Sequence, residues 1–216
     1  RRAHGAGGLA CAVRPPPRIR PRRRLPWSER RFELLLGHTP AFQPFSRTFA
    51  LAVLEWGLNW CVYGSAHQFL VIHAAVVERN GRALLLPGRP GAGKSTLCAA
   101  LVIAGWRLLS DELALVDPQA GHIPALARPI SLKNDAIEII RGLAPAAVFG
   151  PPAVDTHKGT VAHMKPPSPS VRRAEEPAVP HWIVMPRYVP GEALHLGPVS
   201  KTSAFWGMAD NSLNYE

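Results

Sequence analysis

The feature that most constrains this chain is a glycine-rich loop between an apolar segment and a helix-forming one. Residues Gly88 to Ser95 read GRPGAGKS and match the pattern GxxxxGK[S/T] at every fixed position. Glycines allow positive φ and bring backbone N–H groups close to phosphate oxygens, and the N-terminus of a following helix favours the same anions. The apolar segment 82–87 precedes the loop, and a helical segment, 95–105, follows it. The sequence therefore predicts a P-loop that binds the phosphates of a nucleotide.

Phosphate chemistry gives the individual loop residues their expected roles. Lys94 is expected to reach the β- and γ-phosphates, and the Ser95 hydroxyl is expected to coordinate Mg²⁺. Arg89 either adds positive charge near the phosphates or points into solvent. ATP and Mg²⁺ are therefore the predicted cofactors. The predicted nucleotide-binding residues are Gly88, Arg89, Pro90, Gly91, Ala92, Gly93, Lys94, Ser95 and Thr96.

The segment before the loop predicts how the sheet is built. Residues 69–77 are apolar and β-branched, as is typical of a strand, and Asn80-Gly81 is a strong signal for a two-residue hairpin turn. Segment 82–87 is then the returning strand, and its unbroken apolar character suits burial on both faces. A tight hairpin gives the strand that enters the loop an antiparallel neighbour. The sequence therefore favours a mixed, partly antiparallel sheet over a fully parallel one.

Two adjacent acids follow the loop at a spacing that suits phosphoryl transfer. Asp111 and Glu112 lie 17 and 18 residues after Lys94, within a predicted strand region, 106–117, that bends at these acids. Transfer to a hydroxyl requires a metal ligand and a group that positions or deprotonates the acceptor. Asp111 is therefore a candidate catalytic base and Glu112 a candidate metal ligand. The alternatives are a pair that only binds metal, or a polar surface turn.

Two further polar residues each have a structural and a functional interpretation. His73 lies in the apolar strand upstream of the loop, where a histidine is either a satisfied core residue or a group near the site. Glu138 lies in a short predicted helix, 136–143, three residues before Arg141. Side chains at that spacing are neighbours on a helix surface, so the two can simply form an ion pair. Spacing alone favours the ion pair.

The remaining chain is predicted mainly from local patterns. Ser46 is a candidate cap for a helix. The apolar stretch 49–77 is not a predicted membrane span, because four polar residues interrupt it. These residues are Glu55, Asn59, His67 and Gln68. The other predicted segments are a helix over 47–63, a turn over 118–121, a loop-dominated Pro-rich region over 144–180, a strand over 181–188 and a helix that opens the last segment.

The net charge of +10 is concentrated at one end of the chain. Residues 1–31 hold ten Arg and one acid, whereas the other 185 residues carry 15 basic and 14 acidic side chains. This Arg-, Pro- and Gly-rich tail lacks apolar periodicity and is expected to be disordered. It is either a solvated leader or an arm for nucleic acid or anionic lipid. The nearly neutral body makes nucleic acid an unexpected partner.

Cysteine usage bears on the compartment. The three cysteines are widely spaced and include no CxxC pair, which favours a reducing compartment over a disulfide framework. The charged N-terminal residues are not followed by the apolar segment of a secretory signal. A cytoplasmic location is therefore predicted.

Four segments together resemble the catalytic domain of HPr kinase/phosphorylase. They read IHAAVV, LLLPGRPGAGKST, GWRLLSDE and EIIRG, and the resemblance covers about residues 66–145. It implies that Asp111 is the base, and that Glu112 stands at the metal in place of a second Asp of the family. It also implies that Glu138 is a further metal-site carboxylate, and that His73 lies near the phosphate or the base. The EIIRG segment carries one residue more than the family signature.

The resemblance also implies a fold and a branch of the family. The expected fold is a P-loop α/β domain with a mixed, partly antiparallel sheet, similar to the phosphoenolpyruvate carboxykinase core and the HPr kinase C-terminal domain. The expected organisation is a tail over 1–31 and a single P-loop kinase-like domain over 32–216. The tracts RPISLKN and DTHKGTVAHMKPP resemble HPr kinase-related proteins that accompany peptide-modification genes. On that resemblance, His157 and Lys158 are candidate contacts to phosphate or substrate.

The resulting hypothesis is an ATP- and Mg²⁺-dependent kinase that phosphorylates a Ser or Thr hydroxyl of a protein or peptide encoded nearby. One alternative is an ATP-binding module, inactive or slowly hydrolysing, that assists a peptide-modification system. The other is a kinase for the hydroxyl of a small molecule. An oligomer is compatible with each of them.

Overall fold

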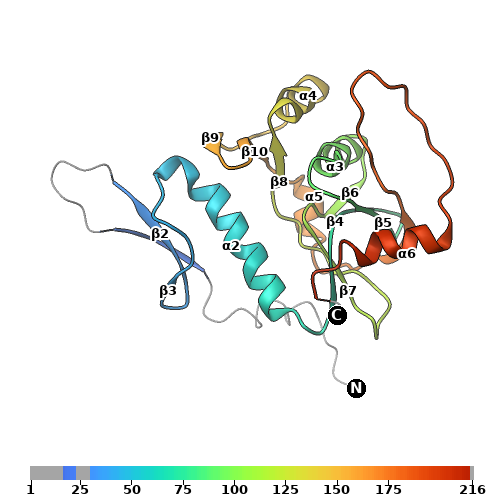
Figure 1. The fold of residues 1–216 in the computed structure, drawn as a ribbon, viewed down its shortest axis with the longest axis horizontal. Helices are drawn as coiled ribbons and strands as arrows, with labels where there is room; N and C mark the ends of the chain where they lie inside the picture. Colours follow the sequence, from blue (N-terminus) through green and yellow to red (C-terminus); the bar gives the residue numbers. More distant parts are fainter. Residues whose placement is uncertain (1–16, 23–29, 215–216) are drawn as a thin grey trace.

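Strands and helices are interspersed along the chain in the computed structural model, which describes residues 17–22 and 30–214 (Figure 1). The strands are β1 (Arg18–Pro21), β2 (Phe32–Leu36), β3 (Thr39–Pro40), β4 (Leu70–Arg79), β5 (Arg82–Pro87), β6 (Arg107–Ser110), β7 (Leu113–Val116), β8 (Ile130–Lys133), β9 (Ala153–Thr156), β10 (Gly159–Met164) and β11 (Val179–Ile183). The helices are η1 (Arg47–Phe49, a 3₁₀ helix), α2 (Ala50–Ser65), α3 (Lys94–Ile103), α4 (Asp135–Leu143), α5 (Ser168–Arg172) and α6 (Lys201–Ala209). The sheets contain both parallel and antiparallel pairs, so the predicted mixed, partly antiparallel α/β class is confirmed.

The hairpin of β4 and β5 lies at the centre of the largest sheet. Its strands pair antiparallel, and its turn residues Asn80 and Gly81 have φ values of 55° and 79°. Two consecutive positive φ values are those of the type I′ turn that Asn-Gly favours. The predicted hairpin is therefore confirmed, and it delivers β5 directly into the glycine-rich loop.

The central sheet has the strand order β11-β5-β4-β6, and β7 also pairs with β4. β11 runs parallel to β5, whereas the other pairs are antiparallel. One half of β4 pairs with β6 and the other half with β7, so Asp111 and Glu112 occupy the bend between two strands that share a partner. The bend follows from the sequence, because these two acids interrupt an apolar run. The predicted bent strand is confirmed.

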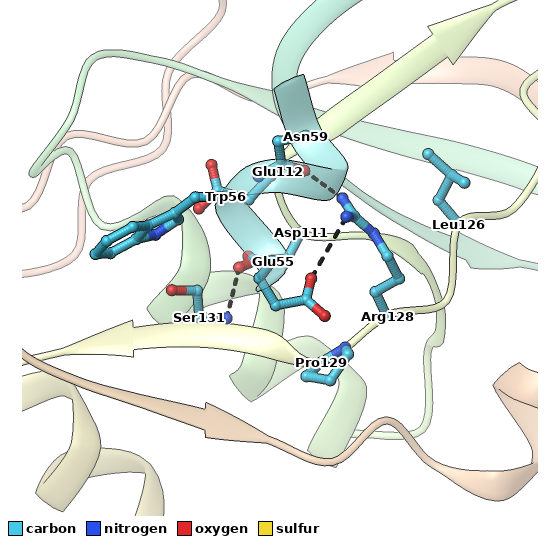
Figure 2. Close-up of a pocket in the computed structure, with 9 residues that line it drawn as sticks. All are labelled: Glu55, Trp56, Asn59, Asp111, Glu112, Leu126, Arg128, Pro129 and Ser131. Atoms are coloured by element: carbon cyan, nitrogen blue, oxygen red, sulfur yellow. Dashed lines mark hydrogen bonds and ion pairs between the residues drawn. The ribbon is translucent and has the colours of Figure 1, made fainter. Parts of the chain in front are cut away.

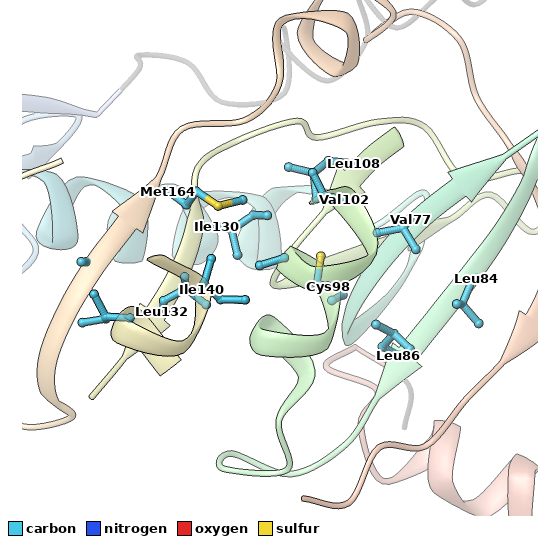
Figure 3. Close-up of a cluster of buried hydrophobic side chains, with 14 residues drawn as sticks. Val77, Leu84, Leu86, Cys98, Val102, Leu108, Ile130, Leu132, Ile140 and Met164 are labelled. Carbon is cyan, nitrogen blue, oxygen red and sulfur yellow. The ribbon is translucent and has the colours of Figure 1, made fainter. Parts of the chain in front are cut away.

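Helix α3 is buried between the central sheet and the second sheet, as Figure 3 shows. Alternate residues of β4 and β5 face it, because successive side chains of a strand point to opposite faces. The same cluster receives Cys98 and Val102 from α3 and Ile140 from α4. The fully buried side chains around α3 include Ala75, Val77, Leu86, Leu108, Ile130 and Leu132. This packing fixes the start of α3 at the end of the central sheet.

The second sheet, in the order β8-β10-β9, corrects the prediction of a loop-dominated region over 144–180. β9 and β10 form an antiparallel hairpin there, and β10 also pairs antiparallel with β8. The prolines that flank this hairpin lie outside its strands, with Pro151 and Pro152 before β9 and Pro166 and Pro167 after β10. They therefore remove no hydrogen bond from the ladder.

Strand β1 corrects the prediction of disorder over residues 1–31. It lies within this segment and pairs antiparallel with β2, and Arg20 forms an ion pair with Glu33 of β2 at 3.1 Å. Backbone pairing and opposite charges across the strands thus order four residues that show no apolar pattern. Residues 1–16 and 23–29 of the predicted tail lie outside the described residues.

Helix α2 lies between the small β1–β3 sheet and the central sheet (Figure 1). Gly57 lies where the helix approaches β2, and a Cβ there would make the Leu34 side chain shift. The helix predicted over 47–63 is confirmed, but it opens with the 3₁₀ turn η1. Ser46 does not cap it through its side chain, because the Ser46 hydroxyl lies 2.6 Å from the Thr48 hydroxyl instead.

The C-terminal segment returns to the central sheet. The strand predicted over 181–188 starts two residues earlier and ends at Ile183, before Pro186, which has no N–H to donate. Helix α6 confirms the predicted final helix, and its Met208 packs on the sheet face opposite α3. Within the described ranges, no helix combines the length and apolar composition that a membrane crossing requires.

Candidate functional site

The glycine-rich loop connects β5 to α3 in the predicted strand–loop–helix order. Gly91 and Gly93 have φ values of 85° and 91°, a region that side chains with a Cβ rarely adopt. The Lys94 ammonium donates to the carbonyl oxygens of Gly88 and Arg89, at 2.6 and 3.1 Å. The lysine side chain therefore folds back over the loop that it follows. The loop also contacts the C-terminal segment, which donates a backbone hydrogen bond to it at 3.2 Å.

Asp111 is the most buried acid at the end of the central sheet, with 5% of its surface exposed. Its Oδ2 accepts a hydrogen bond from the backbone N–H of Ser131, at 2.9 Å, whereas its Oδ1 has no hydrogen-bond partner. Burial, and after it the Glu112 charge, raise the pKa of Asp111 to about 7, against the opposing effects of the hydrogen bonds from Ser131 and the Ser95 hydroxyl. A carboxyl with a pKa near neutrality can exchange a proton with a reacting group.

Glu112 has the opposite tendency. Burial raises its pKa, but the hydrogen bond from His73, the charge of Lys133 and the charge of Lys158 outweigh burial and lower it to about 2. His73 Nε2 lies 3.3 Å from Glu112 Oε2, since His73 on β4 pairs with the residue that follows Glu112. The structure therefore brings His73 to the acid pair. Glu112 remains a carboxylate, while Asp111 can carry a proton.

Lys94 belongs to the same cluster of charges. Burial lowers its pKa, and the charges of Glu112 and Asp111 oppose that effect. Because both acids act on Lys94, the loop lies close to the acid pair. Ser95, at the first turn of α3, also lies near Asp111, because its hydroxyl helps to lower the pKa of that acid. Arg89 and Pro90 are exposed on the outer side of the loop.

A small pocket opens beside the acid pair, and Figure 2 shows its walls. Helix α2 forms one wall, and the extended segment before β8 forms another. The pocket is lined by Glu55, Trp56, Asn59, Asp111, Glu112, Leu126, Arg128, Pro129 and Ser131. Both acids therefore face the same small pocket.

Arg128 joins the two walls of the pocket. Its guanidinium donates to the side-chain oxygen of Asn59 and lies 3.4 Å from a carboxylate oxygen of Glu55. Burial raises the pKa of Glu55, and Arg128 opposes the rise. This arrangement is not among the sequence-based expectations, although the sequence contains a signal for it. Glu55 and Asn59 lie one helical turn apart in an otherwise apolar helix, so they share a face.

The turn between β9 and β10 closes the rim of the pocket. The Lys158 ammonium lies 5.5 Å from the centre of the Trp56 ring, and the His157 ring centre lies 5.1 Å from that of Trp56. Burial lowers the pKa of Lys158, as does Lys133, while Glu112 raises it. The structure thus places both residues of the predicted THKG segment at the site.

His163 is a further residue that the sequence analysis did not single out. It lies on β10 with 3% of its surface exposed, and its Nε2 has no hydrogen-bond partner. Burial lowers its pKa, an effect that Glu112 opposes and Lys133 reinforces. His163 is therefore a neutral ring close to the charged cluster. Its neighbours in sequence are apolar, so only the β10 pairing reveals its position.

Glu138 is not brought to the acid pair. Its side chain is 74% exposed and forms an ion pair with Arg141 at 2.7 Å. This is the surface pair that the three-residue spacing favoured. Glu138 does not line the pocket that contains Asp111 and Glu112.

The oxygen groups at the site fit a magnesium ion. The described part of the chain holds no group of three or more His, Cys, Asp and Glu residues arranged as a metal centre. Mg²⁺ needs less from a protein, because it keeps several waters and takes its other ligands from one or two carboxylates and from substrate phosphates. The Glu112 carboxylate and the Ser95 hydroxyl both act on Asp111, and Glu112 also acts on Lys94. These two are the residues that would hold the ion.

Comparison with known proteins adds one family match. Residues 46–130 match the model of the family described as SynChlorMet cassette protein ScmC. The matched residues include α2, the β4–β5 hairpin, the glycine-rich loop, α3 and the acid pair, and make up less than half of the chain. No curated protein and no solved structure matches the chain. The match shows that this chain is similar to that family over the segments that build the candidate site.

Proposed function

We propose that this protein is an ATP- and Mg²⁺-dependent phosphotransferase of the HPr kinase-like type, with a P-loop at residues 88–95. The observation that carries the proposal is the position of Asp111. A buried carboxyl with an unpartnered oxygen lies beside Ser95, at the start of the helix that follows a GxxxxGKS loop, and it also faces a pocket. Nucleotide binding needs the loop alone. An acid that lies between that loop and the pocket supports transfer of a phosphoryl group to another molecule.

In the proposed mechanism each residue has one task. Backbone N–H groups of the loop and the Lys94 ammonium hold the β- and γ-phosphates, after Lys94 leaves the loop carbonyls that it now contacts. Mg²⁺ held by Ser95 and Glu112 would neutralise charge on the phosphate oxygens. Asp111 accepts the proton of the acceptor hydroxyl, whose oxygen forms the new bond to the γ-phosphorus. The bond from that phosphorus to the β-bridging oxygen breaks, and ADP leaves.

His73 is proposed as a positioning residue. Its hydrogen bond to Glu112 keeps that side chain ionised and oriented, as partners of metal ligands commonly do. The proposed acceptor is a Ser or Thr hydroxyl of a protein or peptide. The matching family is described as a cassette protein, and genes of a cassette lie together. This description supports a search for the acceptor among the products of neighbouring genes.

The experiment incubates the purified chain with ATP labelled at the γ-phosphate and with the peptide products of its neighbouring genes. We expect ADP formation and label transfer with added Mg²⁺, and a loss on the order of 100-fold or more when EDTA removes the metal, because the phosphate charge is then uncompensated. The measurement is labelled acceptor and ADP per enzyme and minute. Label transfer that persists in EDTA would contradict the proposal.

The two alternatives give different products in the same experiment. A module that only binds ATP retains the nucleotide but forms neither ADP nor a labelled acceptor. A small-molecule kinase forms ADP and leaves the label in a compound of low molecular mass. The pocket beside Asp111 is small, and this observation favours keeping the small-molecule kinase as an alternative.

A further inference from the structure

Three strands of the central sheet end at the same edge. β11 runs parallel to β5, and β6 does so too, because β5 and β6 are each antiparallel to β4 between them. The glycine-rich loop follows β5, the acid pair follows β6, and the segment 184–188 follows β11. In the strand order β11-β5-β4-β6, the loop therefore lies between the acid pair on one side and the segment 184–188 on the other. Ligands of open α/β sheets bind beyond such carboxyl ends of strands.

This order determines the direction in which a nucleotide lies. In the proposed mechanism the γ-phosphate faces Asp111 and Glu112, and both acids act on Lys94 of the loop. The chain of phosphates follows the backbone N–H groups of the loop, so the nucleoside leaves the loop on the side away from the acids. That side is occupied by the segment that follows β11.

The segment after β11 lies directly against the glycine-rich loop. The backbone N–H of Tyr188 donates to the carbonyl oxygen of Ala92, at 3.2 Å. A Cβ at Gly93 would lie 3.3 Å from the Cβ of Tyr188, and a Cβ at Gly88 would lie 3.8 Å from the carbonyl oxygen of Pro186. The segment therefore contacts the loop at its first residue and again just before Lys94.

We infer that the ring of Tyr188 is the platform on which the aromatic base of the nucleotide stacks, and that the segment 184–188 forms the base end of the nucleotide site. The inference rests on the proposed function and deepens it. The loop binds the phosphates, which many compounds carry, whereas Tyr188 recognises that these phosphates carry a flat base.

The exposure of Tyr188 suits this role. The residue is 65% exposed, although its backbone is bonded to the loop. Within the described ranges, no other aromatic ring is paired with the Tyr188 ring. Every nucleobase has a π-face and stacks on aromatic side chains. The phenol ring is thus available to a base at the point where the nucleoside leaves the loop.

Two further contacts hold the segment that carries Tyr188. The backbone N–H of Val184 donates to the carbonyl oxygen of Leu85 at 2.9 Å and so continues the pairing of β11 with β5. The Met185 side chain lies against Gly207 of α6. A platform that is held in place before the ligand arrives loses little conformational freedom on binding.

The test compares two ligands in a calorimeter, with the full chain and Mg²⁺. One is ATP, and the other is ribose 5-triphosphate, which has the same sugar and the same phosphates but no base. We expect ATP to bind the wild type about 5- to 100-fold more tightly than ribose 5-triphosphate, the contribution of one stacked base. The ratio of the two Kd values measures the contribution of the base alone.

Two variants of Tyr188 and one matched control follow from the geometry. Tyr188→Ala keeps the N–H that bonds to Ala92 but removes the ring, so the ratio should fall to about 1 through weaker binding of ATP, with the Kd of ribose 5-triphosphate unchanged. Tyr188→Phe keeps a ring that can stack and should retain the ratio of the wild type. Tyr63→Ala removes a tyrosine that is 46% exposed on α2, and it should match the wild type with both ligands.

Three results would overturn the base site while leaving the phosphate site intact. They are equal affinity of the wild type for ATP and ribose 5-triphosphate, a Tyr188→Ala variant that binds ATP as well as Tyr63→Ala does, and a Tyr188→Ala variant that binds both ligands more weakly by the same factor. The last result would give Tyr188 only a structural role beside the loop.

The proposed function fails by different results. A chain that shows the ratio dependent on Tyr188 but transfers no phosphoryl group would support the base site and contradict the phosphotransferase. A wild-type chain that binds neither ligand would overturn the nucleotide site as a whole.

Discussion

The Asp111→Asn variant is expected to lose phosphoryl transfer while it still binds ATP. Asparagine has the shape of aspartate, and its side-chain oxygen can still accept the hydrogen bond from Ser131 N–H. It cannot accept the proton of an acceptor hydroxyl at neutral pH. Loss of a general base lowers rates by about 10²- to 10⁴-fold, and we expect kcat to fall within that range. The measurement is labelled acceptor formed per minute, compared with ATP affinity from calorimetry.

The stability of this variant distinguishes a catalytic from a structural role. A neutral amide is less costly to bury than a carboxyl next to Glu112, so the free energy of unfolding should stay the same or rise. Asp135→Asn serves as the control, since Asp135 is exposed at the first turn of α4 and should leave transfer unchanged. Transfer at the wild-type rate by Asp111→Asn would show that Asp111 is not the base. A variant that unfolds would assign Asp111 a structural role.

The Glu78→Gln variant is expected to lower the free energy of unfolding by about 3 kcal/mol, far from the site. Glu78 is 2% exposed, and its carboxylate accepts from the Arg107 guanidinium and from the backbone N–H of Gly81, the latter at 2.5 Å. Arg107 also donates to carbonyls of Arg173 and Glu176, so the pair ties β4 and β6 to the segment after α5. Removing one charge of a buried pair typically costs about 3–5 kcal/mol, because the other charge stays buried without its partner.

Urea unfolding of the wild type and the variant measures this effect, and its pH dependence gives an independent check. Burial alone would raise the pKa of Glu78, but Arg107, Gly81 and Arg173 outweigh it and lower the pKa below 4.5. Since the folded-state pKa is lowered, the stabilisation from Glu78 is complete above pH 4.5 and is lost as the pH falls through the folded-state value. The difference between wild type and variant should therefore shrink in acid.

The matched control is Glu138→Gln, which breaks the exposed ion pair with Arg141. Surface pairs contribute about 0–1 kcal/mol, so this variant should unfold within that margin of the wild type. Equal effects of Glu78→Gln and Glu138→Gln would contradict the structural role given to the buried pair.

The parts of the fold that the sequence predicted correctly depend on local chemistry. The β4–β5 hairpin follows from Asn80-Gly81, whose residues adopt positive φ more easily than others, and α3 follows from the loop glycines and the apolar run after them. The bend at Asp111 and Glu112 follows from two acids inside an apolar strand. In each case the deciding residues lie within a few positions of the element that they determine.

The parts that the sequence did not predict depend on distant partners. β1 pairs with β2, and Arg20 of β1 binds Glu33, thirteen residues later in the chain. The tail has no apolar pattern that predicts this pairing. β10 is ordered by β8, whose residues lie about thirty positions earlier in a region without periodicity. Prolines that flank β9 and β10 made the whole region resemble a loop.

The same limit applies to the site. The loop, Asp111 and Glu112 could be proposed from spacing, and the structure places Lys94, His73 and Lys158 with them. The small pocket beside the acid pair could not be predicted, because Arg128 reaches Asn59 across 69 positions of sequence. Its walls exist only once α2 docks against the segment before β8. Glu138 shows the reverse case, in which a residue matched a motif but the fold leaves it on the surface.

The central claim, that this loop binds the phosphates of ATP and serves the acid pair behind it, is tested most directly by titrating Mg²⁺-ATP into the wild-type chain and into Lys94→Ala in a calorimeter. Lys201→Ala, an exposed lysine at the start of α6, is the control. The account predicts saturable binding by the wild type and the control, and about 10- to 100-fold weaker binding by Lys94→Ala, the value of one charge-assisted hydrogen bond. Equal affinity of Lys94→Ala and the wild type, or the absence of binding by the wild type, would contradict it.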